Sequence, residues 1–118
     1  MADAGMFIGW GEVVRGREER AVEVFGETVE YYGQLQADGR IESFEPCLLE
    51  PHGGDLDGFV LLRGSQEQID AIRNDDEFER LLTRAGFIVD GLGVVNAALG
   101  EELGRQMGVY QEQIAELV

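Results

Sequence analysis

The sequence predicts an α+β fold in which strands and helices follow the order β-α-β-β-α-β, with an added C-terminal helix. Two observations support this prediction. The apolar residues switch repeatedly between the two-residue spacing of a strand and the three-to-four-residue spacing of a helix. The chain has 118 residues, of which 44% are hydrophobic, so it can bury one core despite a net charge of −15. We therefore expect a single domain over residues 1–118, with its core in residues 6–97.

The first half of the chain is predicted to form a strand, a helix and a second strand. Residues 6–14 are apolar and β-prone, apart from two glycines and one glutamate. Over residues 17–36 the apolar side chains recur three and four residues apart and glutamates fill the opposite face, which indicates an amphipathic helix. An Ala-Asp-Gly sequence then favours a helix end. Residues 41–49 are predicted to form the second strand.

The second half begins with a turn and repeats the pattern. Residues 50–57 are rich in glycine, proline and aspartate, which favours a turn before a third strand over residues 58–63. Ser65, with Gln68 three residues later, is typical of the capping box that starts a helix.

This second helix is predicted to be broken. The sequence Asn-Asp-Asp interrupts it, and Asp75 or Asp76 can cap a new helical turn that Gly86 ends. Residues 87–97 are then predicted to form a fourth strand, and residues 101–117 a final helix. The apolar residues of the final helix form a narrow seam, so it should pack either on its own sheet edge or on a partner subunit.

The two halves align weakly with a shift of 48 residues, and their element order favours a ferredoxin-like fold with an antiparallel sheet. The acidic first helix, the hairpin and the segment 76–81, Asp-Glu-Phe-Glu-Arg-Leu, resemble the dimeric α+β barrel superfamily. This resemblance covers about residues 6–97. It implies a homodimer in which two four-stranded sheets face each other, with a cavity in each subunit.

Charge and composition exclude several kinds of partner. A chain with 24 acidic and 9 basic residues lacks the basic face that nucleic acid or an anionic membrane requires. No segment approaches the roughly 18 apolar residues of a membrane span. The start of the chain lacks the pattern of a signal peptide, and the single cysteine, Cys47, cannot form an internal disulfide. We expect a cytoplasmic protein.

Three carboxylates fall within predicted strands rather than on helix surfaces. By alternation, Trp10, Glu12, Glu42, Phe44 and Asp90 share one sheet face. If a second sheet covers that face, the carboxyl groups gain proton affinity and suit general acid or base catalysis, with Trp10 as an aromatic wall. The alternative is that these carboxylates lie at strand ends or edges and pair with arginines.

Four glycines are expected on the opposite face. Gly9 and Gly11 of the first strand should lie beside Gly91 and Gly93 of the fourth. Such a patch either lets a helix pack closely or forms a pocket floor where a ligand approaches the backbone.

The remaining candidates are cationic. Arg15 and Arg63 occupy matched positions in the two halves and are candidates to hold an anionic ligand, or to form internal salt bridges. His52, the one histidine, is a catalytic candidate or an exposed residue of the hairpin tip. The sequence carries no nucleotide, flavin or zinc motif, so we expect neither a cofactor nor a metal.

We expect a homodimer that binds a small apolar or aromatic ligand, or has no catalytic role. The resemblance also implies an alternative, a cofactor-independent monooxygenase or isomerase acting on a small aromatic or polyketide-like substrate. Its catalytic candidates are Glu12, Asp90 and His52. A haem-binding relative is a third possibility, with His52 as the candidate axial ligand.

Overall fold

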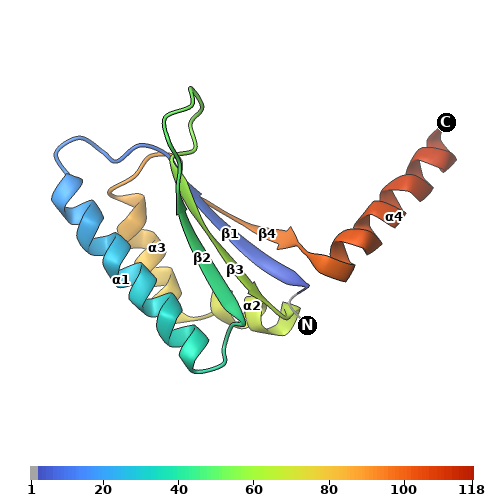
Figure 1. The fold of residues 1–118 in the computed structure, drawn as a ribbon, viewed down its shortest axis with the longest axis horizontal. Helices are drawn as coiled ribbons and strands as arrows, with labels where there is room; N and C mark the ends of the chain where they lie inside the picture. The colour runs from blue at the N-terminus through green and yellow to red at the C-terminus, as the bar shows by residue number, and fades with distance from the viewer. Residues whose placement is uncertain (1–2) are drawn as a thin grey trace.

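The computed structural model describes residues 3–118 and contains one antiparallel sheet with the strand order β2-β3-β1-β4. Three helices cover one face of this sheet, and a fourth projects away from it (Figure 1). The elements are β1 (Ala4–Trp10), α1 (Glu18–Ala37), β2 (Ser43–Leu48), β3 (Gly58–Gly64), α2 (Gln66–Arg73), α3 (Asp76–Gly86), β4 (Gly93–Ala98) and α4 (Gly100–Leu117).

The predicted element order and ferredoxin-like topology are confirmed. β1 lies at the centre of the sheet and pairs antiparallel with both β3 and β4. The β2–β3 hairpin lies on one side of it. No helix among residues 3–118 is long and apolar enough to span a membrane.

Three strands are shorter than the sequence indicates. β2 spans only Ser43–Leu48. β1 ends at Trp10, and β4 begins only at Gly93. The segments beyond them stay together through backbone hydrogen bonds and an isolated bridge between Val13 and Val89. Gly91 has a positive φ of 66°, which departs from strand geometry and explains the interruption.

Both predicted helix starts are confirmed. The Ser65 hydroxyl accepts a hydrogen bond from the backbone of Gln68, whose side chain in turn accepts one from the Ser65 backbone. Asp75 caps α3 by accepting a hydrogen bond from the Glu77 N–H. The second helix of the prediction is therefore two helices, α2 and α3.

The core lies between the sheet and its three helices. Met6, Ile8, Val60 and Leu62 point from adjacent strands toward the helices and are buried. Right-handed crossovers place the helices of both halves on the same face. The residues that meet these strands from the helix layer and its connections are Tyr32, Leu35, Ile41, Ile69, Ile72 and Phe78.

This arrangement corrects the expected orientation of the sheet. The face of Trp10 was predicted to meet a second sheet, but the helices of the same chain cover it. The opposite face carries Phe7 and Phe59, which stack with ring centroids 5.1 Å apart, and Val95, which is 56% exposed. Within residues 3–118, no helix packs on that face (Figure 1).

A charged cluster ties α1 to the start of α3. The carboxylate of Asp75 accepts a hydrogen bond from the Tyr31 hydroxyl and lies 3.4 Å from the Arg40 guanidinium. The hydrogen bond from the Tyr31 hydroxyl, with those from the Glu77 N–H and Arg40, lowers the pKa of Asp75 below its ordinary value of 3.8. Partial burial of the carboxylate acts in the opposite direction and raises that pKa. Burial and the neighbouring carboxylate raise the pKa of Tyr31.

We predict that Asp75→Asn lowers the free energy of unfolding by about 1 kcal/mol at pH 7. Because folding lowers the pKa of Asp75, its charge stabilises the fold above the unfolded-state pKa, and this contribution is lost as the pH falls through the folded-state value. Urea unfolding at several pH values should show the difference from the native protein shrinking below about pH 4. Asp76→Asn, one residue away and outside the cluster, is the control. A difference that persists unchanged to low pH would contradict the prediction.

Candidate functional site

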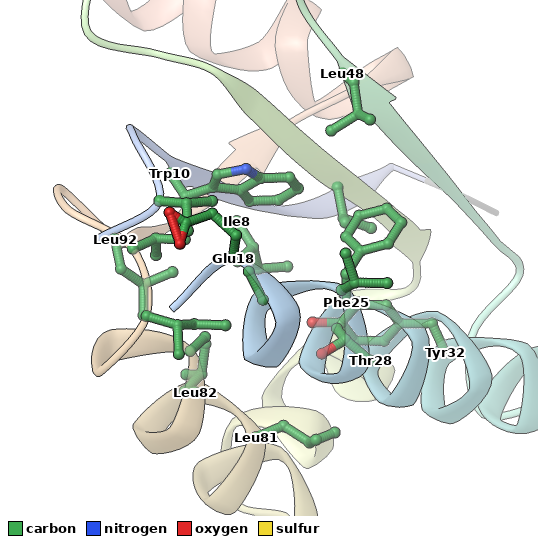
Figure 2. A pocket seen from close by; sticks show the side chains of 17 residues that line it. Ile8, Trp10, Glu18, Phe25, Thr28, Tyr32, Leu48, Leu81, Leu82 and Leu92 are labelled. Carbon is green, nitrogen blue, oxygen red and sulfur yellow. The ribbon is translucent and has the colours of Figure 1, made fainter. Parts of the chain in front are cut away.

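An apolar cavity of about 440 Å³ lies between the sheet and helices α1 and α3 (Figure 2). It is open at one side, and its wall is formed almost entirely by aliphatic and aromatic side chains. Among the lining residues, Trp10 comes from β1, Phe25 and Tyr32 from α1, Val60 from β3, and Leu81 from α3.

The spacing of α1 builds one wall of this cavity. Ala21, Phe25, Thr28 and Tyr32 recur four, three and four residues apart, which places them on one helix face toward the sheet. Ala21 and, on α3, Ala85 contribute only methyl groups. These small side chains leave space between helices that would otherwise be filled.

Trp10 forms an aromatic part of the cavity wall, without the neighbouring Glu12 that the sequence interpretation placed beside it. Its ring meets Phe25 edge to face, with the centroids 6.1 Å apart (Figure 2). A Cβ atom on Gly58 of the neighbouring strand would lie 2.6 Å from the indole. Glycine at position 58 therefore allows Trp10 to lie across the end of β3.

Three polar side chains reach the cavity wall. The Thr28 hydroxyl donates a hydrogen bond of 2.7 Å to the Val24 carbonyl, so its donor is already engaged. Tyr32 is only 1% exposed, and burial raises the pKa of its hydroxyl. The carboxylate of Glu18 accepts hydrogen bonds from backbone N–H groups at the start of α1, including that of Gly16, and these bonds lower its pKa.

The predicted catalytic carboxylates gather elsewhere. Glu12 and Asp90 are joined by a 2.8 Å hydrogen bond between their backbones and line a shallow depression of about 310 Å³. Asp55 and Asp57 of the β2–β3 hairpin line the same depression. Residues 3–118 contain no cluster of three or more His, Cys, Asp or Glu side chains arranged to hold a metal ion.

These positions correct the expectation that Trp10, Glu12 and Asp90 share one enclosed cavity. In the protomer Glu12, Glu42 and Asp90 are exposed. β1 ends at Trp10, so strand alternation does not extend to Glu12, and Glu42 precedes the edge strand β2. Trp10 lines the apolar cavity, and the carboxylates lie outside it.

The two arginine candidates lie at opposite ends of the sheet. Arg63 is within β3 and pairs with Gly5 at the start of β1, whereas Arg15 lies in the turn beyond the end of β1. Antiparallel pairing brings the end of one strand to the start of its neighbour, so matched sequence positions separate in space. The two guanidinium groups therefore do not converge on one anion. Neither forms an ion pair with an acidic side chain of residues 3–118.

His52, Phe44 and Cys47 also lie outside the cavity lining. The exposed His52 ring bonds within its own hairpin, 2.8 Å from the Leu56 carbonyl, and accepts from the Gly54 N–H. Phe44 packs against Tyr32 with the ring centroids 5.9 Å apart. Cys47 is half-buried on the open face of the sheet.

No motif in the sequence marks Tyr32, Phe25 or Ala85 as site residues. The helical periodicity of α1 does mark Phe25 and Tyr32 as inward-facing. Periodicity alone does not tell a residue that fills a core from one that borders a cavity, because both face inward.

Comparison with known proteins finds the same fold. No protein-family model and no curated protein matches the chain. A dimeric protein of unknown function with a ferredoxin-like fold from Bacteroides fragilis is 12% identical, with a TM-score of 0.60 over 82% of this chain and 97% of the other. A dimeric ferredoxin-like protein of unknown function from a Jannaschia species is 12% identical, with a TM-score of 0.61 over the same shares.

A third solved structure has a described activity. SnoaB, a cofactor-independent oxygenase from Streptomyces nogalater, is 16% identical, with a TM-score of 0.54 over 84% of this chain and 95% of the other. At these identities the likeness concerns the fold alone. The chain therefore has the ferredoxin-like α+β fold that these proteins share.

Proposed function

We propose that this protein is a homodimer in which each protomer binds one small, neutral, apolar or aromatic ligand between its sheet and helices α1 and α3. The apolar cavity is the observation that carries the proposal. Its volume of about 440 Å³ falls in the range of roughly 300–1,000 Å³ that is typical of small-molecule sites.

The negative charge of the protein disfavours anionic ligands. The protein carries a net charge of −15, and Glu18 is the charged side chain in the cavity lining. An anionic ligand would be repelled during approach and would lose hydration on entering the apolar cavity. A neutral ligand avoids both costs.

The open sheet face supports the homodimer. Phe7, Phe59 and Leu61 form an apolar patch there, with Val95 beside it. Contiguous exposed apolar surface of this kind marks an interaction site. Two of the solved structures with this fold are described as dimeric.

Helix α4 presents a second exposed apolar surface. None of its residues is buried, and among residues 3–118 its main contact is a small one with the adjoining strand β4. Large side chains along it are exposed, and the helix carries two interior glycines, Gly104 and Gly108, that weaken it in isolation. A partner subunit would supply the missing contacts.

The alternative function is a cofactor-independent monooxygenase or isomerase. It is favoured by the aromatic wall of Trp10 in an apolar cavity and by the description of SnoaB as a cofactor-independent oxygenase. In this alternative, the catalytic candidates Glu12, Asp90 and His52 would act from the hairpin end of the sheet. Oxygen consumption or rearrangement of a bound aromatic compound would favour it, whereas binding without turnover favours the first proposal.

We predict that the native protein binds N-phenyl-1-naphthylamine, a neutral fluorescent apolar probe, at one saturable site per protomer. Ala85→Phe, which places a ring in the cavity, should weaken this binding by about tenfold or more because it removes the space for the probe. Ala71→Phe on the exposed surface of α2 is the matched control and should bind as the native protein does. Equal affinity in both variants would show that the probe binds elsewhere.

We predict a solution mass of about twice 13.0 kDa, measured by light scattering at micromolar concentration and moderate salt. Val95→Arg should shift the mass toward the monomer, because a dimer across the open face would bury an unpaired charge. Gln36→Arg adds the same charge on the exposed surface of α1 and should leave the mass unchanged. A monomeric native protein under these conditions would overturn the homodimer proposal.

A further inference from the structure

Tyr32 presents the one hydroxyl of the cavity wall that is not engaged within residues 3–118. Its ring packs against Tyr31 and Phe44, and the residue is 1% exposed. Figure 2 shows its side chain, with that of Thr28, extending from α1 among the residues that line the cavity.

Two neighbouring hydroxyl groups already donate hydrogen bonds within the chain. Tyr31 donates to Asp75, and Thr28 donates to the Val24 carbonyl. None of the hydrogen bonds of residues 3–118 involves the Tyr32 hydroxyl, and burial alone accounts for its raised pKa. All side-chain nitrogen and oxygen atoms sealed from solvent in this part of the chain have a partner. The Tyr32 hydroxyl is therefore not sealed from solvent, and Tyr32 is one of the residues that line the cavity (Figure 2).

The chemistry of this group is that of a donor. Burial raises the pKa of Tyr32, so the hydroxyl remains protonated throughout the physiological range. A hydroxyl without a partner in an apolar surrounding is unfavourable, and a ligand acceptor placed against it removes that penalty. A ligand without an acceptor leaves the penalty in place.

We propose that the Tyr32 hydroxyl is the specificity-determining group of this cavity, and that it donates a hydrogen bond to a carbonyl oxygen of an otherwise apolar ligand. This inference rests on the proposed function, because it assigns the substrate class of the same site. The ligand is therefore a neutral ketone, ester or comparable carbonyl compound rather than a pure hydrocarbon.

The test compares cyclododecanone with cyclododecane, which differ at the carbonyl and share one ring skeleton. Trp10 is the single tryptophan and lines the cavity, so its fluorescence reports binding of both compounds to the full-length protein. We expect the native protein to bind the ketone about fivefold more tightly than the hydrocarbon, as one net neutral hydrogen bond provides. Tyr32→Phe should remove this preference and leave the affinity for the hydrocarbon unchanged.

Tyr31→Phe is the matched control. It removes the hydroxyl of the adjacent tyrosine, which lies outside the cavity lining and donates to Asp75, so the ketone preference should persist. Unchanged hydrocarbon affinity in Tyr32→Phe also verifies that the variant folds. The native protein provides a test that needs no variant, because equal affinity for the two compounds overturns the inference.

The outcomes separate this inference from the proposed function. If the hydrocarbon binds and the ketone binds no more tightly, the assignment of Tyr32 is wrong and the apolar binding site is retained. The same conclusion follows if Tyr32→Phe still binds the ketone more tightly than the hydrocarbon. If neither compound perturbs Trp10, the proposed function fails and the assignment fails with it.

Discussion

The fold depends on burying one face of the sheet beneath helices of the same chain. Met6 and Ile8 of the central strand, with Val60 and Leu62 of its neighbour, provide the apolar surface on which the helices rest. Removal of this surface from water is the main favourable contribution to folding. Because β1 is central and pairs on both sides, a one-residue change in its register would turn Met6 and Ile8 away from the helices.

Because the helices within residues 3–118 cover only one face of the sheet, the apolar side chains of the opposite face stay partly exposed to solvent in the protomer. The strand pairing that directs Met6 and Ile8 inward also directs Phe7 outward, where it stacks on Phe59 in the absence of any covering helix from residues 3–118. The same alternation places Gly9 opposite Gly93 on that outer face. The predicted patch of four glycines does not form, because the side chains of Phe7 and Leu56 cover Gly9, and Gly11 and Gly91 lie outside the strands. The apolar patch is therefore a direct result of core formation, and it is the surface that we assign to a second copy of the chain.

The cavity arises where the helix layer and the sheet do not fill the space between them. The lining combines small side chains at positions 21 and 85 with large aromatic ones at 10 and 25, and space remains between them. Polar groups at this boundary are either engaged locally, as the Thr28 hydroxyl is, or left available, as the Tyr32 hydroxyl is. Such a site discriminates among ligands by a single hydrogen bond within an otherwise apolar surface.

Much of the fold follows from the sequence because its signals are local. Helical periodicity in residues 17–36, the capping box at Ser65 and the cap at Asp75 each depend on residues within one or two turns of each other, and all were predicted correctly. The strand ends were not, because Glu12 continues the alternation of β1 while the backbone has already left the sheet. That error also led to the expectation of buried carboxylates.

The sequence by itself determined the element order, the helix starts and the placement of Trp10 on the same sheet face as Met6 and Ile8, since these depend on spacing along the chain. Only the tertiary structure decided which sheet face the helices cover. It also decided that Arg15 and Arg63 separate, and that Tyr32 borders an open cavity rather than a filled core. These outcomes depend on how segments far apart in the sequence pack together, and side-chain spacing along one segment carries no information about the volume left between two of them.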